Sequence, residues 1–148
     1  MPKMSIPEIQ SFVSEVFPQS RWPIEIDDLQ DGFIRMRVGV SRRHLRPGNT
    51  VSGPALMAIA DTAMYYLLLS MIGPVPLALT TNLNINFMRA PSLADIFAEA
   101  EMLKLGKRLA VGAVTLYSED TDDPVAHATI TYSVPPNATE QAAEEPSE

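Results

Sequence analysis

The sequence predicts a single α+β domain in which one long apolar helix is wrapped by an antiparallel sheet. The chain has 148 residues, enough for one sizeable core, and its 46% hydrophobic and 20% charged residues are typical of globular proteins. Residues 54–72 form one apolar run of helical length. The segments on both sides alternate like strands. A helix that is apolar on almost every side must be surrounded, and a curved sheet does this.

The first expected element is a short amphipathic helix near the N-terminus. Ser5 and Glu8 have the spacing of a capping box, which satisfies the free amides at the start of a helix. The apolar residues that follow recur at helical intervals: Ile9, Phe12, Val13 and Val16. Pro18 is expected to end this helix.

The central helix has clear signals at both ends. A loop over residues 41–53 leads to Pro54, which suits the first helical turn because no backbone donor is needed there. Gly73 and Pro74 are expected to end the helix after residue 72.

Alternating segments predict the strands of the sheet. Residues 33–40 place Arg35 and Arg37 opposite an apolar face, which indicates a half-buried strand. Four further extended segments follow the helix, at residues 79–88, 94–105, 109–118 and 125–134. We therefore expect a five-stranded antiparallel sheet that is meander-like after the helix.

The chain divides into one folded domain and a tail. Residues 1–134 contain every periodic segment and form the domain. Residues 135–148 are rich in Pro, Ala, Thr and Glu and have almost no large apolar side chain. Such a segment does not offset its own ordering entropy, so a disordered acidic tail is predicted.

Composition excludes several classes of protein. A net charge of -7 argues against nucleic-acid binding, which needs clustered basic residues. The chain has no cysteine, which excludes disulfides, thiolate zinc sites and a Cys nucleophile. With His44 and His127 as the only histidines, no metal site is expected. The N-terminus lacks a secretory signal, so a cytoplasmic location is expected.

Asp61 is the only formally charged residue between Arg46 and Arg89, and it lies in the middle of the apolar helix. Burying even an unpaired polar group costs about 2–7 kcal/mol, so this carboxylate needs an explanation. A membrane span would need about 20 apolar residues, but a mid-helix Asp and alternating flanks favour a soluble core and no membrane. Asp61 is then either satisfied by a neighbouring hydroxyl or amide, or it is functional.

Three stretches carry a resemblance to a known family. Residues 48–63 read GNTVSGPALMAIADTA, a glycine loop followed by a helix that carries an Asp. Residues 80–89 read TTNLNINFMR and residues 104–111 read KLGKRLAV. In this order they resemble the PaaI-like acyl-CoA thioesterases of the 4-hydroxybenzoyl-CoA thioesterase superfamily. The resemblance covers roughly residues 33–134 and implies the hotdog fold, a long central helix wrapped by a five-stranded antiparallel sheet.

The resemblance also implies roles for the candidate catalytic residues. Asp61 would be the base or nucleophile that hydrolyses a CoA thioester to a free acid and coenzyme A. The backbone amide of Gly53 would polarise the thioester oxygen at the helix N-terminus. Thr80 or Thr81 would place the attacking water, although strand propensity explains either threonine equally well. No cofactor is implied, because coenzyme A is part of the substrate.

Other positions are candidate substrate-binding residues. Ser52 stands where the family often has His, and Pro54 stands where it has a second Gly; Asn49 lies just upstream. Cationic side chains are expected to bind the phosphates of CoA, although solvated turns explain each of them equally well: Arg89, Lys104, Lys107 and Arg108. His44 is expected to be a loop or packing residue, and Trp22 is expected to pack in the core or to line the acyl tunnel.

The family implies a homodimer or homotetramer with active sites at the subunit interface. The departures at Ser52 and Pro54 leave an alternative, a catalytically impaired hotdog protein that binds acyl-CoA or lipid. A hotdog dehydratase or hydratase is a weaker alternative, because such enzymes pair a carboxylate with a His and the motif around Asp61 has none.

Overall fold

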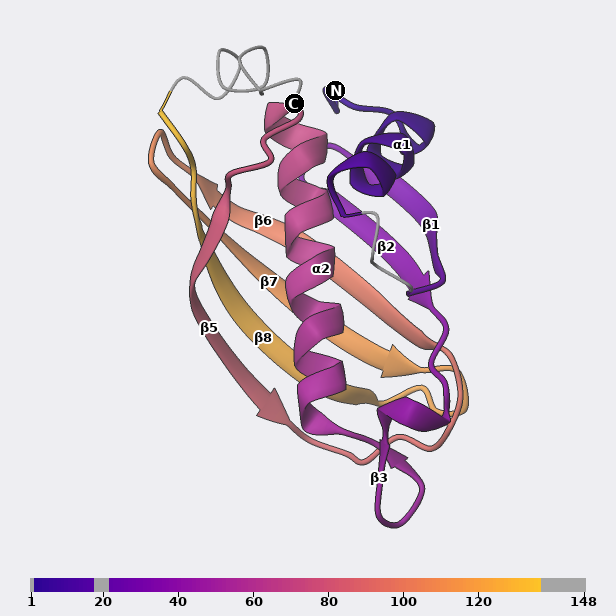
Figure 1. Cartoon of the computed structure of the whole chain (residues 1–148). Helices are drawn as coiled ribbons and strands as arrows, with labels where there is room; N and C mark the ends of the chain where they lie inside the picture. Colours follow the sequence, from indigo (N-terminus) through magenta and orange to yellow (C-terminus); the bar gives the residue numbers. More distant parts are fainter. Residues whose placement is uncertain (1, 18–21, 137–148) are drawn as a thin grey trace.

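The computed structural model describes residues 2–17 and 22–136 and has the hotdog fold. One six-stranded antiparallel sheet curves around a long central helix, α2, as Figure 1 shows. The sheet is formed by β1 (Ile24–Gln30), β2 (Phe33–Val38), β5 (Leu79–Phe87), β6 (Ile96–Leu105), β7 (Leu109–Ser118) and β8 (Pro124–Ser133). Pro18 and most of the predicted tail lie outside the described residues.

The number of strands corrects the sequence prediction. Within the part of the chain that the structure describes, the main sheet has six strands, not five, because Ile24–Gln30 forms an edge strand paired with β2. A bulge between Ile26 and Asp28 makes Asp27 an extra residue and breaks the apolar alternation. The pattern that would have signalled this strand is therefore interrupted.

The order of the strands also differs from a simple meander. The order is β1-β2-β6-β7-β8-β5, so β5 follows the helix but lies at the far edge beside β8. The chain then crosses to β6 along the end of the sheet, where Pro91 accepts a hydrogen bond from the Val51 amide at 2.8 Å. Alternation of apolar and polar residues predicts where strands lie in the sequence, but it does not predict which strands pair with each other.

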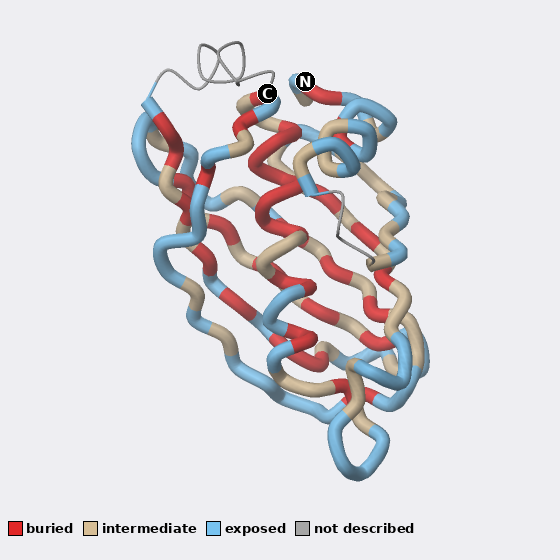
Figure 2. The backbone as a smooth tube through the Cα atoms, in the orientation of Figure 1, coloured by how far each residue is buried: buried red, intermediate tan, exposed pale blue. Residues whose placement is uncertain are grey.

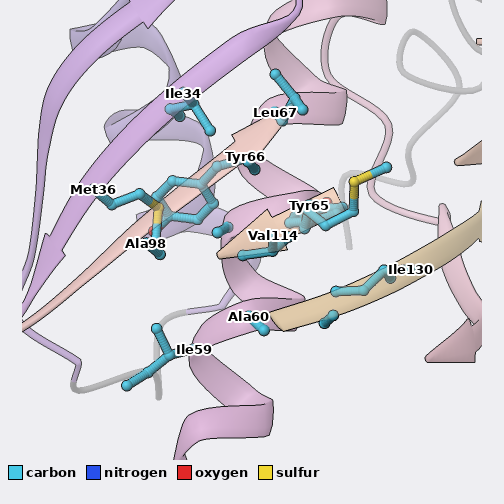
Figure 3. Packing of buried hydrophobic residues seen from close by; sticks show 14 of the residues in the cluster. Ile34, Met36, Ile59, Ala60, Tyr65, Tyr66, Leu67, Ala98, Val114 and Ile130 are labelled. Carbon is cyan, nitrogen blue, oxygen red and sulfur yellow. The ribbon is translucent and has the colours of Figure 1, made fainter. Parts of the chain in front are cut away.

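Helix α2 (Gly53–Ile72) is the core of the fold. Figure 2 shows buried residues along most of the helix, above all its C-terminal half, and at intervals along the strands that face it. Figure 3 shows side chains of the helix packed against side chains of the strands, among them Ile34, Val114 and Ile130. A helix of this length and apolarity could cross a membrane, but 67% of its apolar window is buried inside the fold.

Glycine at position 112 allows the close packing of α2 on β7. A Cβ at Gly112 would collide with the Sδ atom of Met64 and lie 3.1 Å from the carbonyl oxygen of Glu101. Met64 itself is fully buried. The missing side chain therefore sets how near the helix approaches the sheet.

Helix α1 (Ile6–Val16) covers the C-terminal half of α2, beside β1 in Figure 1. The predicted capping box is confirmed: the Glu8 amide donates to Ser5 Oγ at 3.3 Å, and the Ser5 amide donates to Glu8 Oε1 at 2.9 Å. Ile9 is fully buried, and the Lys3 amide donates to the Ser70 carbonyl at 2.6 Å. These contacts fix α1 against α2.

Two short strands precede the central helix. The strands β3 (Leu45–Arg46) and β4 (Thr50–Val51) form a small hairpin, and a 3-10 helix, η1 (Arg42–His44), leads into it. This hairpin and η1 lie at the start of α2, at the bottom of Figure 1.

Candidate active site

Asp61 lies in the third turn of α2 and faces the end of two strands. Its Oδ1 atom accepts a hydrogen bond from Thr80 Oγ1 at 2.6 Å. The same oxygen accepts a second hydrogen bond from the Tyr132 hydroxyl at 2.9 Å. The two hydroxyls therefore offset the cost of holding a carboxylate on an apolar helix.

A bulge in β5 decides between the two candidate threonines. Thr80 pairs with Tyr132 and Asn82 pairs with Thr131, so Thr81 is the extra residue. Thr81 Oγ1 donates to the Thr131 carbonyl at 3.3 Å, whereas Thr80 reaches Asp61. The structure thus brings Thr80, and not Thr81, to the candidate carboxylate.

Tyr132 is a residue of the candidate site that sequence reasoning missed. It lies on the concave face of β8, is 4% exposed, and contacts Asp61 from the next-to-edge strand. Burial, and then the negative charge of Asp61, raise the pKa of Tyr132 well above its usual range. The phenol is therefore a hydrogen-bond donor at any ordinary pH.

An apolar cavity of about 410 Å³ opens between Asp61 and α1. Asp61, Thr62, Thr80 and Tyr132 are among the polar residues that line it. The other walls are mostly aromatic or aliphatic and include Val13, Phe17, Trp22, Tyr65 and Tyr66. A cavity of this size with a few convergent polar groups is typical of small-molecule sites.

A stacked pair holds Trp22 at the wall of this cavity. The rings of Trp22 and His44 lie 4.2 Å apart at an interplanar angle of 11°. The Ser41 amide donates to His44 Nδ1 at 2.9 Å. Burial lowers the pKa of His44, so the neutral ring is favoured at pH 7. His44 is a packing residue, as expected, and Trp22 lines the cavity.

The start of α2 leaves one amide free. Ser52 is the N-cap: its Oγ accepts from the Ala55 amide at 3.3 Å, and its carbonyl accepts from the Leu56 amide at 3.1 Å. Pro54 has no N–H. Within the described part of the chain the Gly53 amide has no acceptor. It is therefore the available donor at the positive end of the helix dipole.

Ser52 and Asn49 both have local structural roles. The side chain of Ser52 is occupied in capping α2. Asn49 lies in the turn between β3 and β4 with a φ of 61°, in the left-handed region where Asn is enriched. Their predicted contacts with substrate stay predictions.

Gly53 and Asp61 do not meet within one chain. They are eight residues apart on the same helix. At 1.5 Å per residue this is roughly 12 Å along the axis. The amide of one chain therefore does not reach a thioester bound at the carboxylate of that chain.

The candidate phosphate-binding cations also lie apart. Arg89 donates to the Pro124 carbonyl at 2.7 Å and lies 3.7 Å from Asp123, beyond the end of β5. Lys107 and Arg108 are exposed at the β6–β7 turn. Phe87, close to Arg89, pairs with Ala126 of β8, and Leu109, next to Arg108, pairs with Ser133 of the same strand. The distance along β8 between these two partners is roughly 23 Å. One chain therefore does not gather these cations.

Comparison with known proteins identifies the family. The sequence model of one protein family, the thioesterase superfamily, matches residues 48–125. The chain therefore belongs to the thioesterase superfamily, and the resemblance found in the sequence is confirmed.

Individual relatives agree with this assignment. A candidate thioesterase from Silicibacter sp. TM1040 is 45% identical over 92% of this chain and 95% of its own, with a TM-score of 0.82. A candidate esterase of Thermoplasma acidophilum is 29% identical over 86 residues, 58% of this chain. That match spans 64% of the curated relative, less than two thirds of its length. A candidate thioesterase of Streptococcus pneumoniae TIGR4, solved with coenzyme A, shares the fold at 21% identity, covers 75% of this chain and 87% of its own, and has a TM-score of 0.67.

Proposed function

We propose that this protein hydrolyses the CoA thioester of an apolar acid to the free acid and coenzyme A. The observation that carries the proposal is the position of Asp61. Its carboxylate lies in the wall of an apolar cavity, and two hydroxyls hold one of its oxygens. A carboxylate that is partly shielded from water is a better base or nucleophile than a solvated one.

The reaction would proceed at the thioester carbonyl carbon. Asp61 either takes a proton from an attacking water or attacks this carbon itself; the second route forms a mixed anhydride, which water then hydrolyses to the free acid and the Asp61 carboxylate. In either case the C–S bond breaks, the sulfur of coenzyme A leaves and is protonated, and water supplies the second oxygen of the acid. The apolar cavity would hold the acyl chain away from solvent during these steps.

We infer that a second copy of the chain completes each site. The Gly53 amide is the free donor at the start of α2 and lies roughly 12 Å from Asp61 along the axis, so a neighbouring copy would have to supply it. The free edge of β5 supports such pairing, with exposed Leu79 and Phe87 along it. A homodimer is the smallest assembly that meets this need, and a homotetramer would keep it.

Release of coenzyme A from acyl-CoA is the direct test of this function. A thiol reagent would follow a panel of aliphatic and aryl thioesters, and we expect turnover for at least one of them. Tight binding of acyl-CoA without thiol release would favour the alternative, an acyl-CoA-binding protein. That alternative is supported by the side chain of Ser52, which caps the helix where the family often has a His.

The solved relative with coenzyme A supports a CoA ester as substrate. Reversing two charges in the β6–β7 turn, Lys107→Glu with Arg108→Glu, is expected to raise KM for acyl-CoA about tenfold. A thioester that lacks the nucleotide should be unaffected, since the cations would contact CoA phosphates. Steady-state kinetics at low and high salt would check this, and the difference should shrink at high salt.

The matched control reverses two other exposed charges, Arg42→Glu with Arg43→Glu. Both arginines lie in η1, at the end of the molecule opposite the β6–β7 turn. This double substitution changes the net charge by the same amount as the one in the turn. Equal effects of the two double variants would mean that net charge, and not the β6–β7 turn, attracts the nucleotide.

The size of the acyl group should depend on Trp22. A second cavity of about 210 Å³ lies beside the first, and four side chains line both: Val13, Phe17, Trp22 and Tyr66. Trp22→Ala would remove one of these four side chains and so enlarge the space between the cavities. We expect kcat/KM for long acyl chains, relative to short ones, to rise at least about tenfold. Trp22→Phe keeps a ring in the wall and should show little change; an unchanged chain-length profile in Trp22→Ala would contradict the assignment.

A further inference from the structure

We propose that Tyr132 is a positioning residue whose hydroxyl, together with that of Thr80, holds Oδ1 of Asp61 and leaves Oδ2 as the reacting oxygen. The inference rests on the proposed function, because it assumes that Asp61 is the catalytic group. It adds a residue from the last strand of the chain to the site and specifies which carboxylate oxygen reacts.

The two hydrogen bonds have good geometry and a common acceptor. At 2.6 Å and 2.9 Å, both O–H···O distances lie in the normal range. A carboxylate oxygen offers about two lone-pair directions, so two donors occupy Oδ1. Within residues 2–17 and 22–136, Oδ2 accepts no hydrogen bond. The two oxygens of Asp61 are thereby made different before substrate binds.

The phenol acts by position and not by proton transfer. Its hydroxyl is enclosed, and burial raises the pKa of Tyr132 far above the working range of an enzyme. It also lies 3.3 Å from the backbone carbonyl of Asp61, so its single proton is shared between two acceptors of the same residue. Both contacts tie the phenol to one point of α2.

Neighbouring elements fix the phenol on both sides. In the sheet, Tyr132 lies between Thr80 of β5 and Ala110 of β7. Its ring stacks on Tyr65 of α2 at 6.0 Å. Two strands and the helix therefore determine where the two hydroxyls stand, and an error of about 1 Å in a reacting group can cost a hundredfold in rate.

Tyr132→Phe is the test, because it removes the hydroxyl and keeps the ring. We expect kcat to fall about 10- to 100-fold, because Asp61 would lose one of its two restraints. KM, and the Kd of a non-hydrolysable thioether analogue of acyl-CoA, should stay within about twofold. A tyrosine that only satisfies its own buried hydroxyl would leave kcat unchanged, and that result would overturn the proposal.

Two further variants make the test specific. Tyr117→Phe makes the same chemical change on β7, opposite Phe97 and away from Asp61, and should leave kcat unchanged. Thr80→Val removes the other donor, while Thr80→Ser keeps it and should restore most of the rate. Because both donors act on one oxygen, the loss in Thr80→Val with Tyr132→Phe should differ from the product of the single losses. Strictly multiplicative losses would contradict a shared acceptor.

The proposal and the proposed function fail in different ways. Full turnover in Asp61→Asn would remove the catalytic role of Asp61 itself. Loss of turnover in Asp61→Asn with full turnover in Tyr132→Phe would leave the function standing and overturn only the role of Tyr132. If Tyr132→Phe did not fold, Thr80→Val would carry the test: removing its donor should lower kcat about 10- to 100-fold, and an unchanged rate would overturn the shared restraint of Oδ1.

Discussion

Asp61→Asn is expected to lower kcat at least about a hundredfold while the protein stays folded. The amide oxygen can still accept hydrogen bonds from Thr80 and Tyr132, so the contacts that hold the side chain persist. The atom that replaces Oδ2 would then be an amide nitrogen, which is neither a base nor a nucleophile. Thiol-release kinetics together with the melting temperature would measure both parts of the prediction.

A surface carboxylate provides the control for this variant. Asp122 is exposed in the turn before β8, and Asp122→Asn should leave turnover unchanged. If folded Asp61→Asn kept a rate near that of the unmodified protein, another group would have to activate the nucleophile.

Gly53→Pro is expected to lower kcat about 100- to 1,000-fold, the usual effect of removing one oxyanion donor. The substitution deletes an N–H that has no acceptor within the described residues, so no hydrogen bond is lost. Because a residue with a Cβ is disfavoured in helical conformation before Pro54, we expect a lower melting temperature in Gly53→Pro and in Gly53→Ala alike. Proline is tolerated at the first helical position. Ser52 already has the extended conformation, with φ -68° and ψ 153°, that a following proline requires. Kinetics and circular dichroism would separate the rate from the fold.

Gly53→Ala is the matched control, because it keeps the amide. Its Cβ would lie 3.4 Å from the Phe87 ring, which is an ordinary contact. A large loss in Gly53→Pro with a small loss in Gly53→Ala would identify the amide as the important group. Equal losses would show that space beside the glycine matters instead.

Mixing the two inactive variants tests whether neighbouring chains share a site. In a dimer of one Asp61→Asn chain and one Gly53→Pro chain, one site would combine both substitutions and the other would have neither. Random reassociation in a dimer would then restore about a quarter of the original activity. No recovery from mixtures that demonstrably exchange subunits would place Gly53 and Asp61 in separate functions.

Much of the candidate site could be predicted, for reasons specific to each residue. Asp61 is the only charge in a long apolar segment, so the free-energy cost of burying a carboxylate is enough to mark it as a candidate functional residue. Gly53 required the resemblance, since a glycine before a helix has many uses. The choice of Thr80 over Thr81 depends on a bulge, which shifts the register by one residue and leaves no clear mark in the sequence.

Tyr132 and the first strand could not be predicted, for physical reasons. Tyrosine is an ordinary strand residue, and nothing near Tyr132 in the chain indicates a carboxylate 71 residues away. Strand β1 carries acidic residues and a bulge, so its apolar face is broken at Asp27. Both failures concern pairing between distant segments, which local periodicity does not encode.

The hydrogen bonds of Asp61 also bear on when activity arises during folding. Its two donors lie 19 and 71 residues further along the chain, on the edge strand and on the strand beside it. Contacts between distant segments incur the entropy of loop closure before they stabilise anything, so they form late. Helix α2 can gain helical structure locally, whereas the carboxylate acquires its partners only when β5 pairs with β8. Recovery of turnover on refolding would therefore report closure of the sheet and not formation of the helix.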